Sequence, residues 1–276
     1  MLRRQRTGSV VCPSCGRLTG VADERCFNCG RLRPGMWGFT GALRRFGGDL
    51  GFVQFVLGGC ILLYAATLLA GGGPAPAGGP WSIFPPTTEA LARFGASGSI
   101  LVFELGRWWT PLSAGWLHGD LLHLFFNLLW LRQLAPVTAE YYGASRMVIL
   151  YTLASVTGFL LSSAVAAFFP FLGGARVTVG ASAAIFGLLG ALVRYGRRGG
   201  SRALTTQAWG YAVMLFVYGL VATRVDNWAH LGGFAGGYLG ALWLDPLKPE
   251  RTDHAVGALL CLVATAGAIA ASLLVG

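Results

Sequence analysis

The chain has 276 residues, of which 54% are hydrophobic and 12% are charged, and its formal net charge at pH 7 is +10. An ordinary soluble domain carries about 25% charged residues, so this composition excludes a typical soluble globular protein and indicates an integral membrane protein. The positive charge does not indicate a nucleic-acid partner, because its distribution follows the membrane topology described below.

The first 50 residues predict a separate cytosolic region. They contain two near-repeats, Cys12-Pro-Ser-Cys15-Gly-Arg-Leu and Cys26-Phe-Asn-Cys29-Gly-Arg-Leu. Each repeat places two thiolates on one tight turn, and two such turns supply four soft ligands in a tetrahedron. The stretch at about 10–33 resembles a small zinc ribbon, which implies a structural zinc ion on these four cysteines. Iron in a rubredoxin-like site is the competing interpretation. So short a segment needs a metal to fold, and a role in recruiting a cytosolic partner stays open.

Seven apolar segments follow, and each is long enough to predict a membrane helix. They lie at about 51–71, 118–135, 147–169, 181–195, 206–222, 227–244 and 255–275. With the N-terminus in the cytoplasm, 17 of the 21 Lys and Arg residues fall inside, and only Arg93, Arg107, Arg176 and Arg224 fall outside. This asymmetry follows the positive-inside rule. It predicts a multi-pass protein of the cell (inner) membrane, with the N-terminus cytoplasmic and the C-terminus outside.

Polar residues gather at the outer ends of three predicted helices. An ionisable group at the bilayer centre costs about 2.5–3.5 kcal/mol on the insertion scale, so such a residue suggests a function. His118 and His123 fall in the second segment, with Asn127 one turn below His123, and His230 falls in the sixth. The second, fourth and sixth segments all run from outside to inside. These side chains and Ser182, at the start of the fourth segment, are therefore expected at similar depth.

The fourth helix is predicted to be short and closely packed. From Ser182 to Arg194 it spans about 18 Å, against a hydrocarbon core of about 30 Å, which places Ser182 roughly 10 Å below the outer interface. Small residues that allow close helix contact recur along the fourth segment and the sixth. They are Ala183, Gly187 and Gly190 in the fourth, and Gly232, Gly236 and Gly240, or Gly233 and Gly237, in the sixth. Such contact would bring the Ser182 hydroxyl within hydrogen-bond reach of His230.

Three motifs in this region resemble those of the rhomboid intramembrane proteases. They are Gly180-Ala-Ser182-Ala, Ala229-His230-Leu-Gly-Gly233-Phe-Ala-Gly-Gly237, and the spacing His118-x4-His123-x3-Asn127. The resemblance covers about residues 50–250. It implies an all-α polytopic membrane protein with a rhomboid-like core of six transmembrane helices at 51–250, a seventh C-terminal transmembrane helix at 251–276, and the zinc ribbon in front at 1–50.

The resemblance also implies roles for individual residues. Ser182 becomes the nucleophile and His230 its general base, without a cofactor for catalysis. The backbone N–H of Ser182, with His123 and Asn127, would hold the oxyanion. The supporting residues would be His118 in the polar outer cavity, Gly180 beside the scissile bond, and Gly233 and Gly237 between the two helices.

The chain departs from the family pattern at two places. Phe186 stands where the family often has tyrosine, so it is expected to stack on the imidazole but lacks the hydroxyl. The loop sequence Arg107-Trp-Trp109 is followed by Thr110 rather than arginine, which leaves the anchoring of the loop open. Asp226 lies one turn above His230 and is interpreted as a helix-start carboxylate in preference to a group that orients the imidazole.

The function predicted from these residues is hydrolysis of peptide bonds in or near the transmembrane segments of other membrane proteins, within the lipid bilayer. The main alternative is a catalytically silent rhomboid-like protein that binds membrane clients. Further alternatives are a structural polar network and a transporter or metal permease that uses the histidines. A permease would need acidic partners within the membrane, but Glu140 and Asp245 are predicted to be cytosolic.

Overall fold

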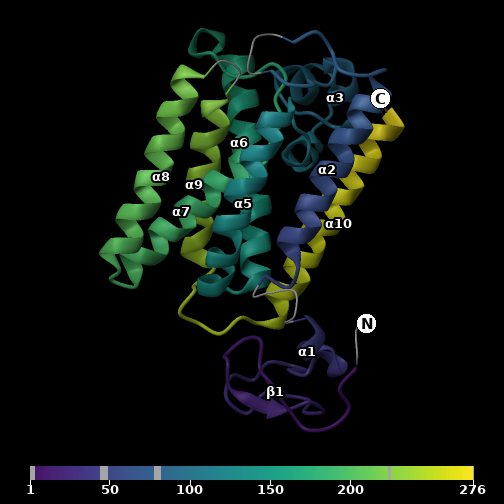
Figure 1. Cartoon of the computed structure of the whole chain (residues 1–276). Helices are drawn as coiled ribbons and strands as arrows, with labels where there is room; N and C mark the ends of the chain where they lie inside the picture. Colours follow the sequence, from purple (N-terminus) through teal and green to yellow (C-terminus); the bar gives the residue numbers. More distant parts are fainter. Residues whose placement is uncertain (1–3, 44–48, 78–81, 223–224, 276) are drawn as a thin grey trace.

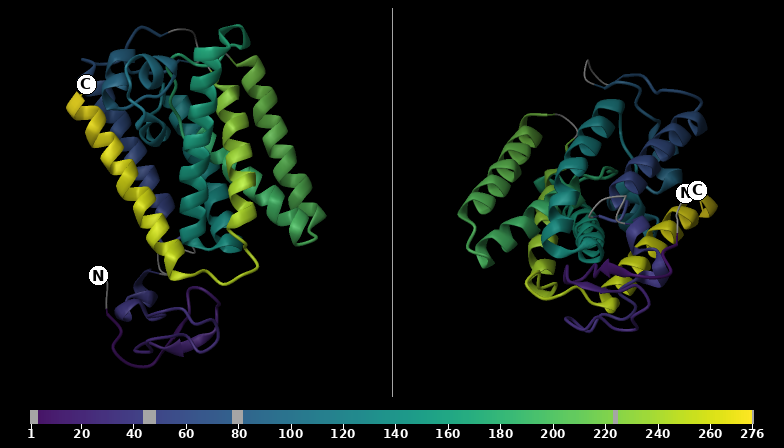
Figure 2. Two further views of the ribbon diagram at one scale, coloured as in Figure 1. Left: turned by 180° about the vertical axis from the view of Figure 1, so that it is seen from behind. Right: turned by 60° about the horizontal axis from the view of Figure 1, so that its bottom comes forward.

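A small β-ribbon and a bundle of long helices make up the chain (Figure 1). The structure is a computed structural model, and it describes residues 4–43, 49–77, 82–222 and 225–275. The N-terminal ribbon lies at one end of the helical bundle and the C-terminus at the other, as the views from the front and from behind both show (Figures 1 and 2). The predicted division near residue 50 falls beside residues 44–48, which lie outside the described residues, as does Arg224.

The ribbon is built on one hairpin. Strand β1 (Ser9–Val11) pairs antiparallel with β2 (Leu18–Gly20), with Val10 opposite Thr19. A short 3-10 helix, η1 (Met36–Gly38), and the helix α1 (Thr40–Leu43) close the module. Its buried apolar side chains are chiefly Val10 and Val21, beside two of the cysteines. Such a core is too small to hold the ribbon by apolar burial alone.

In the described part of the chain, seven long helices form the bundle, one at each predicted segment, and the chain is an all-α polytopic membrane protein. They are α2 (Phe52–Ala70), α5 (Leu121–Tyr142), α6 (Ala144–Phe168), α7 (Ser182–Arg198), α8 (Arg202–Val221), α9 (Asn227–Trp243) and α10 (Thr252–Val275). Among the described residues, α2, α6, α8 and α10 are long and apolar enough to cross a membrane by themselves. The helices α7 and α9 have 17 residues each, or about 25 Å at 1.5 Å per residue. Both pack against the longer helix α6, which has 25 residues.

The long connection between α2 and α5 contains short helices that the sequence did not predict. They are α3 (Thr88–Phe94), the π-helix η3 (Ile100–Glu104), α4 (Thr110–Ser113) and the 3-10 helix η4 (Ala114–Trp116). A further 3-10 helix, η5 (Pro170–Leu172), follows α6. Helices α3 and α4 pack against α10, so the C-terminal helix supports this connection.

Two predicted boundaries of the second membrane segment were wrong. His118 was placed in the segment, but it precedes α5, because Asp120 is the N-cap whose side chain accepts from the backbone N–H of His123. The loop predicted from residue 136 begins only after Tyr142, because α5 continues through Pro136. A proline inside a helix removes one hydrogen bond without ending the helix when neighbouring contacts hold it.

Helix α7 occupies the centre of the bundle and contacts α5, α6, α8 and α9. Every residue from Ala183 to Val193 is buried. The two glycine rows of α9 face different helices. Methyl groups added at Gly233 and Gly237 would overlap the carbonyls of Ala183 and Gly187 on α7, and the other row, Gly232, Gly236 and Gly240, faces α6. The missing side chains therefore set how closely α9 approaches both neighbours.

We expect Gly237→Ala to destabilise the fold, because its methyl group would overlap the Gly187 carbonyl and force α9 away from α7. Overpacking of this kind typically costs about 1–3 kcal/mol. The measurement is the midpoint of thermal unfolding in detergent. Gly58→Ala on α2, where nothing lies within 4 Å of the added methyl group, is the matched control and should leave the midpoint unchanged. Equal midpoints for the two variants would contradict the packing argument.

Candidate active site and cysteine cluster

The predicted site residues come together where α5, α7 and α9 begin. Ser182 is the first residue of α7, and Phe186 lies one turn later on the same face. The ring of Phe186 stacks on the imidazole of His230, with centroids 4.1 Å apart and planes 13° from parallel. Gly233, one turn after His230, contacts the Ala183 carbonyl. These contacts place His230 beside the first turn of α7, on the side where Ser182 lies.

A hydrogen bond from the start of α9 holds the imidazole of His230. Its Nδ1 lies 3.1 Å from Oδ1 of Asn227, three residues earlier. Within the described residues, Asp226 makes no hydrogen bond to the imidazole. Its Oδ1 accepts from the backbone N–H of Ala229 and from the hydroxyl of Ser162, so the interpretation as a helix-start carboxylate is confirmed. The sequence analysis missed Asn227, although residues three apart on a helix are neighbours.

His123 is oriented by the loop in front of α5. The backbone N–H of Gly119 donates to its Nδ1 over 3.3 Å, so the proton of the neutral ring lies on Nε2. That nitrogen faces Gly180, where an added Cβ would lie 2.6 Å from it. Gly180 also has a φ of +128°, a conformation that L side chains rarely adopt. Position 180 therefore requires glycine, because any side chain there would overlap the imidazole of His123.

Asn127 and His118 complete the polar cluster. The side-chain amide of Asn127 donates to the carbonyl of His123 over 2.8 Å and keeps a second N–H for another acceptor. His118 is fully buried, lies edge-to-face against His123 with centroids 5.2 Å apart, and has no hydrogen-bond partner on either ring nitrogen within the described residues. Ser182 and His123 are only partly buried, whereas His118 and Asn127 are buried.

Comparison with known proteins shows the family to which this chain belongs. The family model of the rhomboid domain matches residues 105–245. This chain belongs to the rhomboid family. The rhomboid protease GluP of Bacillus subtilis (strain 168) is 34% identical over 182 residues, which cover 65% of this chain and 34% of that protein.

Similar relatives occur in eukaryotes. The RHOMBOID-like protein 5 of Arabidopsis thaliana is 34% identical over 60% of this chain and 52% of its own length. The Rhomboid-like protease 1 of Toxoplasma gondii is 31% identical over 65% of this chain and 64% of its own length. The chain thus spans about a third to two thirds of the length of these relatives.

The loop that departs from the rhomboid pattern is anchored on α10. The indole N–H of Trp109 donates to the hydroxyl of Ser272 over 3.0 Å. The guanidinium of Arg107 donates to the carbonyl of Ala92 over 3.3 Å and reaches that of Val275. Helix α10 lies beyond the matched rhomboid domain, so a segment outside that domain fixes the loop in this chain.

The four N-terminal cysteines, also outside the rhomboid domain, form one cluster. Their Sγ atoms all lie within 4.8 Å of one another, with Cys12–Cys29 and Cys15–Cys26 at 3.7 Å. Sulfurs about 2.3 Å from a shared tetrahedral centre are about 3.8 Å apart, so the geometry fits a four-coordinate metal ion. The two sequence repeats form the same turn, in which the N–H of Gly16 or Gly30 donates to the carbonyl of Cys12 or Cys26.

The thiols of the cluster differ in acidity. Burial and contact with the other cysteines raise the pKa of Cys29 to about 12. Burial also acts on Cys15, but hydrogen bonds from the backbone of Arg17 and the side chain of Asn28 lower its pKa to about 7. Four thiolates so close together repel one another, and a bound cation offsets that repulsion.

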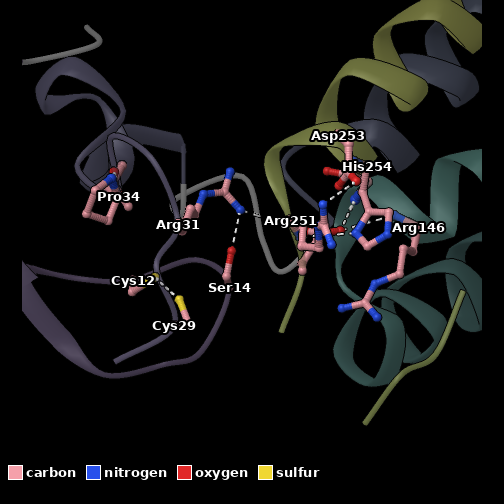
Figure 3. A network of polar contacts seen from close by, with 12 residues as sticks. Cys12, Ser14, Cys29, Arg31, Pro34, Arg146, Arg251, Asp253 and His254 are labelled. Atoms are coloured by element: carbon pink, nitrogen blue, oxygen red, sulfur yellow. Dashed lines mark hydrogen bonds and ion pairs between the residues drawn. The ribbon is translucent and has the colours of Figure 1, made fainter. Parts of the chain in front are cut away.

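The ribbon contacts the membrane domain through a buried ion pair. Figure 3 shows Arg31 on the side of the ribbon that faces the segment carrying Arg251. Nη1 of Arg31 lies 3.8 Å from the carboxylate of Glu250, and both side chains are less than 10% exposed. The other oxygen of Glu250 accepts from the backbone N–H groups of Ser145 and Arg146 at the start of α6. No side chain of its own caps α6 at Gly143. Glu250, from the connection before α10, thus caps α6 and holds the ribbon.

We expect Glu250→Ala to destabilise the protein more than Arg31→Ala, because it removes the α6 cap as well as the ion pair. Loss of a cap with two charge-assisted hydrogen bonds costs about 1–3 kcal/mol. The measurement is the midpoint of thermal unfolding, with limited proteolysis to follow release of the ribbon. Arg17→Ala, at an exposed ribbon position, is the control. The capping role is wrong if the Glu250 variant unfolds at the same temperature as this control.

Proposed function

We propose that this rhomboid is an intramembrane serine endopeptidase in which Ser182 is the nucleophile and His230 the general base. The observation that carries the proposal is the placement of His230. Its ring stacks on Phe186, one turn after Ser182, and its Nδ1 is hydrogen-bonded to Asn227. This arrangement leaves Nε2 as the nitrogen that can take a proton from the serine.

In the proposed reaction, the Ser182 hydroxyl attacks the carbonyl carbon of the scissile peptide bond while His230 Nε2 takes its proton. Negative charge develops on the carbonyl oxygen. The donors available to it are the Ser182 N–H, which has no carbonyl partner within α7 because it lies in the first turn, the Nε2–H of His123 and the free amide N–H of Asn127. His230 then gives its proton to the leaving amine, and water hydrolyses the acyl-enzyme with the same two residues.

The remaining residues of the prediction receive supporting roles. His118 belongs to the polar cavity around His123, and Gly180 keeps the chain beside the oxyanion site free of a side chain. Phe186 fixes the imidazole plane. Gly233 and Gly237 hold α9 against α7 at the close contact described above.

The proposed substrates are membrane proteins cleaved in or near a transmembrane segment. A helix must unwind locally to expose a peptide bond, so Gly, Pro or polar residues near the outer face should favour cleavage. We place the protein in the cell (inner) membrane with its N-terminus in the cytoplasm and its C-terminus outside, from the distribution of Lys and Arg. We propose that residues 51–250 form the six-helix rhomboid core and that residues 251–276 form the seventh transmembrane helix.

Cleavage of a model single-span substrate by the purified protein in lipid tests the serine mechanism. Ser182→Ala should abolish both cleavage and labelling by an active-site fluorophosphonate, with a loss of about 10³-fold or more, because the nucleophile is removed. Ser163→Ala is the matched control, because this buried serine on α6 has no hydrogen-bond partner in the described structure and its loss should change neither readout.

Two results would contradict the serine mechanism. One is a Ser182→Ala protein that still cleaves. The other is a well-folded wild type that neither cleaves nor labels, which favours the catalytically silent, client-binding function. Free cleavage of soluble peptides without cleavage of any membrane-embedded substrate would contradict the proposed substrate class.

We also propose that Cys12, Cys15, Cys26 and Cys29 hold one structural zinc ion, with iron as the alternative occupant. The ion would complete the fold of a module whose own apolar core is small, and catalysis needs no metal. In the structure the ribbon contacts the membrane domain at Glu250. A cytosolic partner of the ribbon is a separate proposal, and the contact with Glu250 does not test it.

Elemental analysis of the purified protein should find one zinc ion per chain, and Cys29→Ser should lower the metal content sharply because one of four ligands is lost. Removal by a chelator should make the ribbon sensitive to proteolysis. Cys261→Ser is the control, because this cysteine lies in α10, away from the cluster. Full metal content in the Cys29 variant would contradict the assignment, and iron in place of zinc would correct the identity of the ion.

A further inference from the structure

Asn227 bridges the candidate base to a neighbouring helix. Its Oδ1 lies 3.1 Å from Nδ1 of His230, and its Nδ2 donates to the carbonyl of Phe216 on α8 over 3.2 Å. We infer that Asn227 is a positioning residue of the reaction, which keeps the proton of His230 on Nδ1 and leaves Nε2 free to act on Ser182. The inference rests on the proposed function and assigns the orienting group for that site.

The two hydrogen bonds of Asn227 fix the protonation pattern of His230. A carbonyl oxygen only accepts, so the Phe216 carbonyl requires the NH₂ group of the amide to face it. The amide oxygen then faces His230. Because this oxygen also only accepts, Nδ1 of His230 must carry the proton, and in the neutral ring the lone pair is on Nε2. When Nε2 takes a proton in the reaction, the bond from Nδ1 to Asn227 persists.

Stacking alone does not orient the imidazole. The contact with Phe186 fixes the plane of the ring, but a half-turn of the ring within its pocket would exchange the nitrogen and carbon edges. The hydrogen bond to Asn227 removes this ambiguity, since only one orientation places Nδ1–H against the amide oxygen. Asp226, the charged residue next to Asn227, makes no hydrogen bond to the imidazole within the described residues: its Oδ1 accepts from Ala229 and Ser162, and its Oδ2 has no hydrogen-bond partner.

A glycine on α8 makes room for this amide. A methyl group added at Gly219 would overlap Oδ1 of Asn227. The same methyl group would also meet Cγ1 of Val225, in the loop before α9. We therefore expect Gly219→Ala to displace the amide oxygen by a change on a different helix, without changing any residue of α9. Gly210 lies on the same helix, and nothing lies within 4 Å of a methyl group added there. The two substitutions are chemically identical and differ only in what the methyl group meets.

The test measures kcat and KM for a single-span substrate in lipid, and the rate of fluorophosphonate labelling, which reports on the serine without a bound substrate. Asn227→Ala should lower kcat and the labelling rate about 10–100-fold with little change in KM, an effect of the size seen when a group that orients a metal-ligating histidine is lost. Asn227→Asp should keep most of the rate, because a carboxylate oxygen still accepts from Nδ1–H. Gly219→Ala should follow Asn227→Ala, and Gly210→Ala should match the wild type.

Each other outcome decides against the inference. A folded Asn227→Ala protein with wild-type kcat and labelling rate would overturn it. If Asn227→Asp falls as far as Asn227→Ala, the link to the Phe216 carbonyl matters instead of the acceptor for His230, and the positioning role is wrong. Thermal unfolding midpoints identify any variant that is merely unfolded. Failure of the proposed function is distinct, because the wild type itself would then neither cleave nor label.

Discussion

The close approach of α9 to α7 is the contact on which the rest of the structure depends. Lipid chains are as apolar as leucine, so burial of apolar side chains gives helices in a membrane little reason to associate. Van der Waals packing between backbones replaces it, and such packing requires the absence of side chains. Gly233 and Gly237 provide this against the carbonyls of Ala183 and Gly187. The same contact brings the first turn of each helix together, and these turns carry Ser182 and His230.

Polar groups within a bundle of membrane helices are costly unless each has a partner or a chemical use. Most of these groups cap the start of a helix or hydrogen-bond to a residue near that start. Asp120 and Asp226 cap α5 and α9, and Asn227 satisfies His230 and a carbonyl of α8 at once. The groups left without a partner among the described residues include both ring nitrogens of His118, beside the proposed oxyanion site. The pattern is that of a polar cluster in which the helix caps and His230 are hydrogen-bonded, whereas His118 keeps both ring nitrogens unpaired.

The two ends of the chain support the rhomboid domain from outside it. The ribbon meets Glu250, which also caps α6, and α10 holds the loop through Ser272 and Trp109. Because α6 packs along both α7 and α9, a change at its capped end acts on the helix pair that carries the site. Segments that the family match does not cover thus contact the rhomboid domain at both ends of the bundle.

The sequence by itself determined what depends on near neighbours in the chain. It predicted the seven helices from their apolar length and the two cysteine turns from a repeated local motif. It also predicted, from the direction in which each helix runs, that polar residues gather where three of the helices begin. It also predicted that glycine rows allow close packing. It did not determine which row of α9 faces α7, because the rows at 232 and 233 lie side by side on one helix.

Only the tertiary structure decided that question, and with it the partner of His230. Asn227 and Asp226 are both about one turn before His230, so local geometry admits either of them. The choice comes from distant groups, Ser162 on α6 and the Phe216 carbonyl on α8, which engage the two side chains differently. Likewise, no spacing rule pairs Glu250 with residues 145 and 146, since more than 100 positions separate them. Helix geometry fixes neighbours within a turn, whereas contacts between helices are fixed only when the whole bundle packs.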